Sequence, residues 1–344
     1  MLKRTSSRRF LFALLVLLVY SVFQSTAIGD VSIPLNDVWG IILAKFPVLG
    51  DAFSTYDYPS TWVTIVRSIR LPRVLAGVLV GSSLAMAGAV MQGIFRNSMA
   101  DPFIIGISSG AAFGASISLV LELFVAKSVT MYFTPVLAFA GALGAVILVY
   151  TISRVDGRVP VETLLLAGVA TSSFLSALTS ALIYTYSRDV YSVLFWLTGS
   201  LGASRWSDVT TLVIAFFFGL LGVLLFAKDL NAMLLGEDVA QSLGTEVENA
   251  KRWAILAASV VTATAVAASG IIGFVGLIVP HMARLLVGPD HRVLIPVSTL
   301  LGGIFLVWCD VTSRVILPVP VGIITALFGA PFFIYLLKER KRMP

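Results

Sequence analysis

The chain has 344 residues, of which 58% are hydrophobic and only 12% are charged. With a mean hydropathy of +0.97, it has too few polar residues to cover a soluble globule, so a bilayer protein is predicted. Lys and Arg exceed Asp and Glu by 24 − 18 = 6, but the basic residues gather at the edges of apolar runs and form no nucleic-acid surface. Cys309 is the only cysteine, which excludes an intrachain disulfide and a cysteine metal cluster.

The first apolar run, Phe10–Ile28, follows a basic segment that contains Lys3, Arg4, Arg8 and Arg9. Such a segment is either a secretory signal peptide, cleaved near Ala27, or a retained first helix. The run is long enough to span a bilayer, so the retained helix with a cytoplasmic N-terminus is favoured.

Ten apolar runs have about the length of a spanning helix, roughly 20 residues. These predicted spans are Phe10–Ile28, Val74–Phe95, Pro102–Leu123, Met131–Ser153, Val161–Thr185, Asp208–Phe226, Trp253–Ala268, Ile271–Val287, Val293–Trp308 and Val321–Leu337. An even number of spans puts both termini on one side, and the basic head, tail and alternate loops indicate that this side is cytoplasmic. The sequence therefore predicts an all-α membrane protein of about ten helices in one domain, residues 1–344.

Two further patterns refine this bundle. The outer segment Gly29–Trp62, which holds three prolines, predicts a loop with short interfacial pieces. The spacing of Gly81 with Gly88, and of Gly106, Gly110 and Gly114, predicts places where helices approach closely in lipid.

A polar island separates the sixth and seventh predicted spans, at residues 234–244. Leu235, Val239 and Leu243 recur every four residues, which predicts one apolar face of a short helix. Glu237 and Asp238 suit the start of this helix, and Gly244 suits its end. The island lies on the predicted cytoplasmic side and is interpreted as a docking surface.

The sequence offers little that could do covalent or ion-coupled chemistry. An ion-driven carrier usually keeps ionisable groups in mid-membrane, but Asp208 and Asp310 lie near the ends of their spans. The chain has no phosphate loop and no hydrolase or metalloprotease motif, so we expect no enzyme activity. The isolated His281 and His291 are interpreted as structural. The energy for any transport would then come from a partner.

Two loops carry residues with a second interpretation. Asp101 and Pro102 are a typical helix cap and first helical residue, but the preceding turn could also narrow a cytoplasmic passage with Asn97 and Met99. On the opposite side, the positive-inside rule disfavours cations. The arginines there, Arg67, Arg70, Arg73 and Arg314, are either headgroup anchors or contacts for an acidic partner.

Several motifs in chain order now resemble one family, the FecCD permeases. They are Arg70-Leu71-Pro72-Arg73, Gly88 through Gln92 with Asn97 to Pro102, Leu164-Leu165-Leu166-Ala167-Gly168, the Gly-Glu-x-x-Ala-x-x-Leu-Gly island, Gly273 through His281, Asp290-His291-Arg292, and Pro320-Val321-Gly322 with Gly329-Ala330-Pro331. The match covers nearly the whole chain from Arg70 onward. The family supplies the membrane subunits of type II ABC importers for ferric siderophores, haem and vitamin B12.

The resemblance implies a homodimer of ten-helix subunits in the cytoplasmic membrane, similar to the vitamin B12 importer permease. Two cytoplasmic ATPase subunits and an extracytoplasmic substrate-binding protein are the implied partners. ATP and Mg²⁺ would be bound by the ATPase, and this chain would hold no cofactor and no metal. The resemblance places coupling helices for the ATPase at about 229–249, and the residues that would make this contact are Leu235, Gly236, Glu237, Asp238, Ala240, Leu243 and Gly244.

The resemblance also assigns the other sites. Arg70, Arg73 and Arg314 match positions that meet acidic residues of the binding protein. Asn97, Met99, Val161 and Glu162 match elements of the cytoplasmic gate, although Ser98 replaces the usual proline, and Val161 and Glu162 replace small hydroxyl residues of some members. Thr171, Ser172 and Ser173 either line the pathway or satisfy helix backbone.

The cargo is not encoded in any motif, because selectivity largely resides in the separate binding protein. The frequency of substrates within the family favours a ferric siderophore, followed by vitamin B12 and haem. The alternative from another class is an ion-coupled secondary transporter, which would work without an ATPase.

Overall fold

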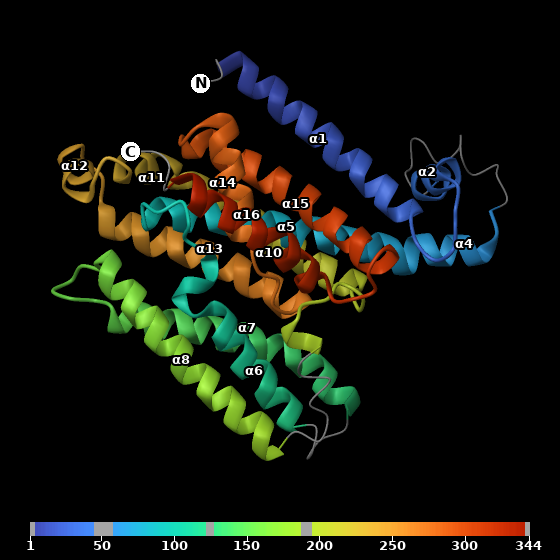
Figure 1. The fold of residues 1–344 in the computed structure, drawn as a ribbon, viewed down its shortest axis with the longest axis horizontal. Coiled ribbons are helices and arrows are strands. Elements are labelled where there is room, and N and C mark those ends of the chain that lie inside the picture. Colours follow the sequence, from blue (N-terminus) through green and yellow to red (C-terminus); the bar gives the residue numbers. More distant parts are fainter. Residues whose placement is uncertain (1–3, 45–57, 122–126, 187–194, 341–344) are drawn as a thin grey trace.

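The computed structural model describes residues 4–44, 58–121, 127–186 and 195–340. All the named elements among these residues are helices, and the ribbon in Figure 1 shows them as one bundle. The prediction of an all-α membrane protein is confirmed.

Ten helices occupy the positions of the ten predicted spans. They are α1 (Arg4–Ala27), α5 (Leu71–Ile94), α6 (Ile107–Leu121), α7 (Lys127–Ile152), α8 (Val161–Tyr186), α10 (Trp206–Leu225), α13 (Val247–Ser269), α14 (Val275–Val287), α15 (His291–Val315) and α16 (Val321–Arg340). Within the described part of the chain, seven helical segments are long and apolar enough to cross a membrane alone. Helix α5 belongs to the longest of them, the continuous helical segment Ser60–Ile94.

Helix α14 is shorter than predicted, because the backbone of residues 270–274 is not helical. Gly270 has a φ of 71° and Phe274 a φ of 69°, and both values end helical geometry. The remaining 13 residues of α14 rise about 20 Å, less than the roughly 30 Å of a hydrocarbon core. Non-helical backbone at this depth is tolerated where protein buries it, and Ile272 is 1% exposed.

The predicted span Pro102–Leu123 is also divided into two pieces. A 3₁₀ turn, η2 (Pro102–Ile105), comes first, and Gly106 in the left-handed region, with a φ of 87°, joins it to α6. The Asp101 carboxylate accepts a hydrogen bond of 2.8 Å from the Phe103 N–H. The sequence-based cap at Asp101 and Pro102 is therefore confirmed.

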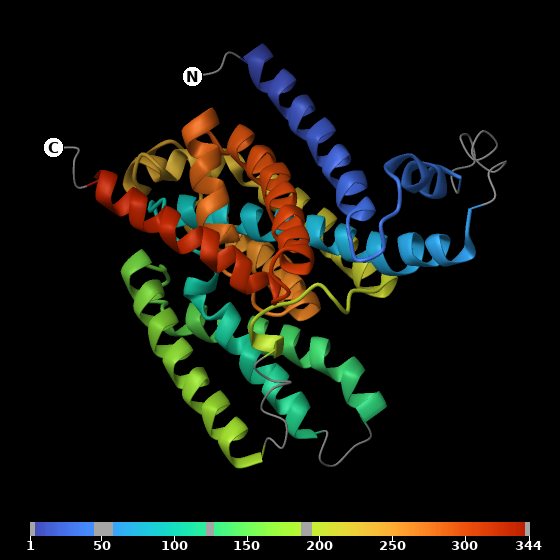
Figure 2. The same ribbon diagram turned by 45° about the vertical axis from the view of Figure 1, so that its right-hand side comes forward.

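Short helices lie at the two ends of the bundle. Helices α2 (Leu35–Leu43) and α4 (Ser60–Thr64), with the π-helical turn η1 (Ile65–Arg70), lie at one end, which we call the α2 end. They confirm the expected short pieces in the outer segment, whose residues 45–57 lie outside the described chain. Helices α11 (Ala227–Met233) and α12 (Glu237–Ser242) lie at the other end, the α12 end. Helix α1 begins at the α12 end, and α16 finishes there (Figure 2).

Helix α5 forms the centre of the bundle and packs against α13, α14 and α15. Glycines set the closest approaches, because a methyl group at Gly81 would overlap the carbonyl of Gly302 in α15, and one at Gly88 would overlap that of Gly276 in α14. Helices α6 and α7 meet in the same way at Gly110 and Gly141. The predicted role of these glycines in close packing is thus found at named helix pairs.

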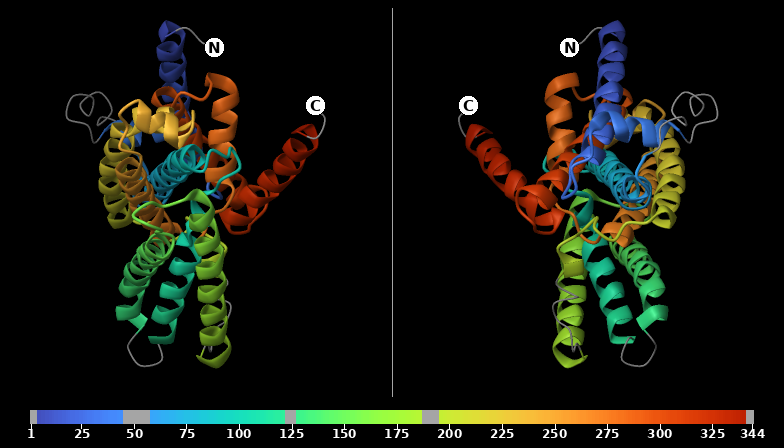
Figure 3. Two further views of the ribbon diagram at one scale, coloured as in Figure 1. Left: turned by 90° about the vertical axis from the view of Figure 1, so that its left-hand side faces the viewer. Right: turned by 90° about the vertical axis from the view of Figure 1, so that its right-hand side faces the viewer.

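The peripheral helices leave two open sides. Helices α6, α7 and α8 form a group below the centre, and α1 lies on the opposite side against α15. Helix α16 extends away from the body, as Figure 3 shows from both sides. Large apolar side chains on α8 and α16 stay exposed in the single chain, for example Leu166 at 71% and Ile334 at 66%. These faces are available to lipid or to another protein.

Candidate functional site

The α12 end presents apolar side chains to the outside of the bundle. Leu235, Val239 and Leu243 are 67%, 45% and 65% exposed. Val239 lies within α12 and Leu243 is its C-cap, whereas Leu235 precedes the helix and is separated from it by the non-helical Gly236. Glu237 and Asp238 form the first turn of α12, while Ala240 is fully buried on the opposite side. Gly236 and Gly244 flank the helix with φ values of 115° and 84°. The predicted short helix therefore exists, and three exposed apolar side chains, called the apolar stripe below, lie within it (Val239) or beside its ends (Leu235 and Leu243).

A buried lysine holds α12 to the body of the protein. Lys251 in α13 is only 1% exposed, and its ammonium group donates to Glu237 Oε2 at 2.7 Å and to Glu248 Oε1 at 3.1 Å. The same group donates to the carbonyl of Val159, just before α8, at 3.1 Å. The start of α12 therefore has a fixed position relative to α13 and α8.

Helix α11 is held in turn by the loop between α14 and α15. Asn231 donates to Asp290 Oδ1 at 2.6 Å and accepts a hydrogen bond from the backbone N–H of His291 at 2.8 Å. Asp290 also caps α15 by accepting from the Arg292 N–H. His291 is completely buried and packs against Gly93 of α5, which agrees with a structural role.

The turn predicted as part of a gate follows α5 at the α12 end. The Asn97 side chain accepts a hydrogen bond of 3.0 Å from the Met99 N–H, which closes the turn on itself. Met99 lines a cavity of about 10 Å³ with residues of α14 and α16, namely Leu277, Ile278, His281, Phe332 and Phe333, and with Ser98. Burial raises the pKa of Asp101, at the end of this turn, to about 6, against the opposing effect of the Phe103 N–H.

The second predicted gate element is the beginning of α8, where Val161 is half-buried and Glu162 is exposed. Neither residue lines the small cavity that Met99 lines. The two segments are instead joined through η2, which packs against α8 where a methyl group on Gly168 would overlap the Ile104 carbonyl.

Thr171, Ser172 and Ser173 point in different directions from α8. Thr171 is 5% exposed, Ser172 is half-buried, and Ser173 is exposed. Three consecutive helical residues are about 100° apart, so they cannot share one face. Of the three, Ser173 is the most exposed in the single chain.

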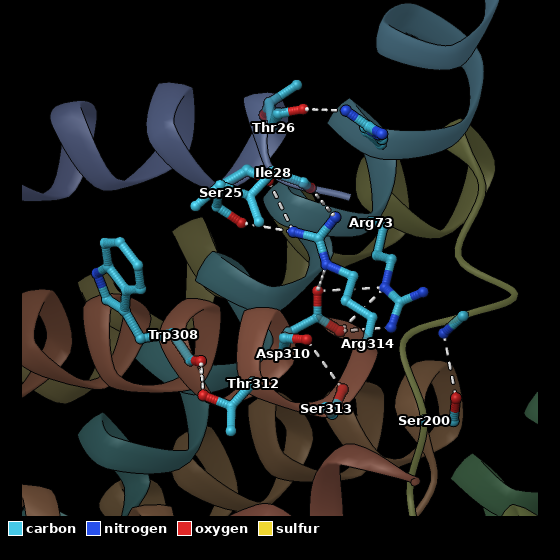
Figure 4. A network of polar contacts seen from close by, with 12 residues as sticks. Ser25, Thr26, Ile28, Arg73, Ser200, Trp308, Asp310, Thr312, Ser313 and Arg314 are labelled. Carbon is cyan, nitrogen blue, oxygen red and sulfur yellow. Dashed lines mark hydrogen bonds and ion pairs between the residues drawn. The ribbon is translucent and has the colours of Figure 1, made fainter. Parts of the chain in front are cut away.

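The arginines at the α2 end take part in an internal network, drawn in Figure 4. Asp310 of α15 is 1% exposed and accepts from Arg73 of α5, with Arg73 Nη2 at 2.8 Å and Nε at 2.9 Å from Asp310 Oδ1. Arg314, one turn after Asp310, places its Nε 3.2 Å from Oδ2 of the same carboxylate. The side chains of Arg73 and Arg314 remain 22% and 12% exposed.

Two of these arginines also bind the C-terminal end of α1. Arg314 donates to the carbonyls of Ser25 at 2.7 Å and Ile28 at 2.9 Å. Arg70, which is 6% exposed, donates to the carbonyls of Thr26 and Ala27 at 3.2 and 2.9 Å and to that of Val31. These bonds satisfy carbonyls that a helix end leaves unpaired. They also tie α1 to η1 and α15.

An apolar groove runs between α16 and the segment around Leu197. Its volume is about 480 Å³, and it is lined by Leu197, Thr198, Ile271, Gly322, Ile323, Ala326, Leu327, Ala330 and Pro331. Within the described residues, no three His, Cys, Asp or Glu side chains gather in a way that could hold a metal ion. The groove therefore suits apolar surface.

Sequence reasoning missed two residues that organise these sites. The sequence predicts only that Asp310 lies near the end of its span, although its spacing of four residues from Arg314 is the usual signal of a helical ion pair. Lys251 directly precedes the predicted span Trp253–Ala268, a position typical of a loop cation. Its pairing with Glu248 three residues earlier was readable, but its pairing with Glu237 and Val159 requires the tertiary structure.

Comparisons with known proteins agree with this architecture. The model of the FecCD transport family matches residues 14–339. A cobalamin import system permease of Halobacterium salinarum is 49% identical over 300 residues, which cover 86% of this chain and 80% of that protein. The hemin transport system permease of Yersinia pestis is 37% identical over 346 residues, with 98% of both chains covered.

Further similarity comes from an iron transporter and from a solved structure. The Fe(3+) dicitrate transport permease of Escherichia coli is 40% identical over 276 residues, which cover 79% of this chain and 85% of that protein. A solved structure described as an inward-facing conformation of a metal-chelate type ABC transporter superposes with a TM-score of 0.82 at 31% identity. That comparison covers 96% of this chain and 99% of the other.

Proposed function

Because this chain belongs to the FecCD transport family, it is a membrane permease subunit of an ABC importer for an iron chelate, haem or cobalamin, and we propose that its cargo is cobalamin. It is a transport subunit and not an enzyme. ATP and Mg²⁺ belong to the partner ATPase, and family membership rules out the ion-coupled carrier.

The identity of 49% to a cobalamin permease carries the choice of cargo. The iron and haem permeases compared with this chain share 35% to 40% of their residues with it. This difference favours a corrinoid over the ferric siderophore that family frequency alone ranks first. A ferric chelate remains the second candidate, because the ferric dicitrate permease is 40% identical.

The test is uptake by cells from which this chain and redundant importers have been removed. We expect that restoring the chain restores uptake of labelled cobalamin and leaves uptake of labelled ferric siderophores and haem unchanged. Restored uptake of an iron chelate instead would transfer the assignment to the second candidate. Restoration of none of the three would contradict the proposed cargo class.

We further propose that the α12 end faces the cytoplasm, with both termini there. Exposed arginines and lysines gather at this end, in the turns and short segments that join the spans. Examples are Arg96, Arg154, Arg158, Lys228 and Arg292. The positive-inside rule then sets the orientation of the whole bundle.

In this orientation the exposed face of α12 is the proposed contact for the ATPase. Its three large apolar side chains, beside Glu237 and Asp238, supply surface that gains stability when a partner covers it. The residues of the predicted coupling site are Leu235, Gly236, Glu237, Asp238, Ala240, Leu243 and Gly244, in the coupling segment at about 229–249. The gate is proposed at Asn97, Met99, Val161 and Glu162, and the pathway lining at Thr171, Ser172 and Ser173.

At the α2 end, docking of the binding protein is proposed at Arg73, with Arg70 and Arg314 behind it. Arg73 has the largest exposure of the two arginines that share Asp310. An acidic side chain of the binding protein would compete with Asp310 for its guanidinium group. We expect Arg73→Glu to weaken binding-protein affinity in a way that high salt diminishes.

The proposed assembly is a homodimer with two ATPase subunits and one binding protein. The groove beside α16 supports the dimer, because a two-fold axis would bring the same apolar patch of each protomer together. The whole chain, residues 1–344, is proposed to be one permease domain in this assembly.

A further inference from the structure

The ammonium group of Lys251 is the most buried charge near α12. Among the described residues that are less than 2% exposed, Lys251 has the largest side chain. A lysine has three donors, and here three acceptors meet them: Glu237 Oε2, Glu248 Oε1 and the Val159 carbonyl. All the bonding capacity of this buried ammonium group is therefore used.

The three acceptors belong to three different segments. Glu237 is the first residue of α12, Glu248 lies in the first turn of α13, and Val159 precedes α8 by two residues. Glu248 closes the arrangement, since its second oxygen, Oε2, accepts the Val159 N–H at 2.9 Å. Both backbone groups of Val159 are thus bound to this cluster, and its side chain is only 2% exposed.

The hold on the start of α8 continues beyond Val159. The Thr163 hydroxyl, in the first turn of α8, lies 2.9 Å from both the Pro160 carbonyl and the carbonyl of Ser153, the residue after α7, and its single hydrogen is shared between these two acceptors. Hydrogen bonds from Glu237 through Lys251 to Val159, the chain from Val159 to Pro160, and the bond from Thr163 to Pro160 therefore join α12 to the first turn of α8. This turn contains Val161 and Glu162, the residues proposed for the gate.

A buried lysine is an expensive way to fill space. Removing an ammonium group from water costs several kcal/mol, and an apolar side chain of similar volume often packs at least as favourably. The ammonium group of Lys251 has one advantage over an apolar side chain. It fixes three segments at defined distances through charge-assisted hydrogen bonds. These bonds alone show only that the three segments are held together. Because α12 is also the proposed contact of the ATPase, a movement of the ATPase would act on this cluster.

From these contacts we propose that Lys251 is a positioning residue that makes α12 and the start of α8 move as one body. This inference rests on the proposed function, in which the ATPase docks on α12. When the ATPase shifts α12, the Lys251 cluster carries the displacement to the first turn of α8. Without Lys251 the ATPase can still hydrolyse ATP, but the movement of α12 no longer reaches the start of α8 and the gate opens less often per ATP.

The experiment uses the full complex of this chain, its ATPase and its binding protein in proteoliposomes. Uptake and ATP hydrolysis are measured together, so that the readout is substrate moved per ATP hydrolysed. We expect Lys251→Met to lower this ratio about fivefold to tenfold while the ATPase still co-purifies. We expect Lys251→Arg to recover part of it. Lys338→Met is the matched control, because Lys338 is exposed in α16, and it should leave the ratio unchanged.

A second measurement needs no substitution at Lys251. Spin labels on Ser242→Cys in α12 and Val155→Cys beside α8 report one distance within a protomer. Both sites are exposed, whereas the native Cys309 is buried. We expect this distance to stay constant between the nucleotide-free and ATP-bound complexes. Singly labelled chains supply the distances between protomers.

Two results would overturn the proposal. One is an unchanged ratio of uptake to hydrolysis in Lys251→Met, and the other is a label distance that changes with ATP in the complex with Lys251 intact. A wild-type complex that neither binds an ATPase nor takes up substrate would count instead against the proposed function. The wild-type complex is measured first, so a failure of the proposed function is distinguished from a failure of the proposal for Lys251.

Discussion

Single arginines connect segments that lie far apart in the sequence. Arg70 binds carbonyls at the end of α1, about 40 residues before it, and Arg314 binds the same helix end from α15. Both guanidinium groups hold the end of α1 in the single chain. The docking role and the structural role of these residues therefore make different predictions.

If Arg70 holds α1 in place, Arg70→Gln should lower the stability of the purified protein. The shorter, neutral side chain leaves at least one buried carbonyl unsatisfied, which costs about 2 kcal/mol. We expect a lower thermal midpoint of unfolding in detergent, at low and at high salt alike. Arg154→Gln, at an exposed position, should leave the midpoint unchanged. Unaltered stability of Arg70→Gln together with weaker binding-protein affinity would assign Arg70 to docking alone.

At the scale of the element, α12 separates its two faces clearly. Ala240 faces the protein, while Leu235, Val239 and Leu243 face outward. A helix of six residues is too short to be stable by itself in water. Its position therefore depends on the Lys251 cluster on one side and, in the complex, on whatever covers the apolar stripe.

We expect Leu235→Glu combined with Leu243→Glu to abolish co-purification of the ATPase. Two carboxylates in the stripe would have to lose their water when the partner covers them. Gln241→Glu is the matched control, since Gln241 lies on the same helix between the stripe positions. Retention of the ATPase by the double variant would show that α12 is not its contact.

Much of these elements is readable from the sequence, and the exceptions have physical causes. Apolar runs locate the ten helices because lipid demands such runs. They fail at α14, where positive φ values at Gly270 and Phe274 shorten a helix that composition would extend. Apolar runs also do not predict contacts between distant residues, such as Lys251 and Val159, which are 92 residues apart.

The candidate sites show the same division. The periodicity of Leu235, Val239 and Leu243 predicts a short helix with exposed apolar side chains, which is a local property. It extends the helix too far at its start, because the φ of 115° at Gly236 leaves Leu235 outside α12. The partner of Arg73 is 237 residues away, and nothing local to either residue shows the contact. Sequence alone therefore locates Arg73 near a membrane surface but not beside Asp310.

At the scale of the whole molecule, the single chain leaves α16 only partly covered (Figure 3). The groove of about 480 Å³ beside it is apolar and open. In the proposed homodimer each protomer also supplies half of the pathway, and a two-fold axis next to α16 would meet both needs.

We therefore expect Ala326→Trp, which fills the groove, to shift the purified permease from dimer to monomer. The measurement is the mass of the protein component by light scattering in detergent. Val213→Trp is the control, because Val213 is an exposed apolar residue on α10, away from the groove. A dimer that survives Ala326→Trp would place the two-fold axis elsewhere.

The anchoring of α1 has a consequence for the order in which the protein is made. Helix α1 leaves the ribosome before α5 and α15, and its C-terminal end is secured in two steps. Arg70 follows soon after α1 and binds the carbonyls of Thr26 and Ala27, whereas Arg314, which binds the Ile28 carbonyl, is 286 residues further along the chain. A chain that stops before Arg314 therefore holds the end of α1 through Arg70 but lacks its bonds to α15. This half-secured helix end distinguishes truncated chains from those that contain α15.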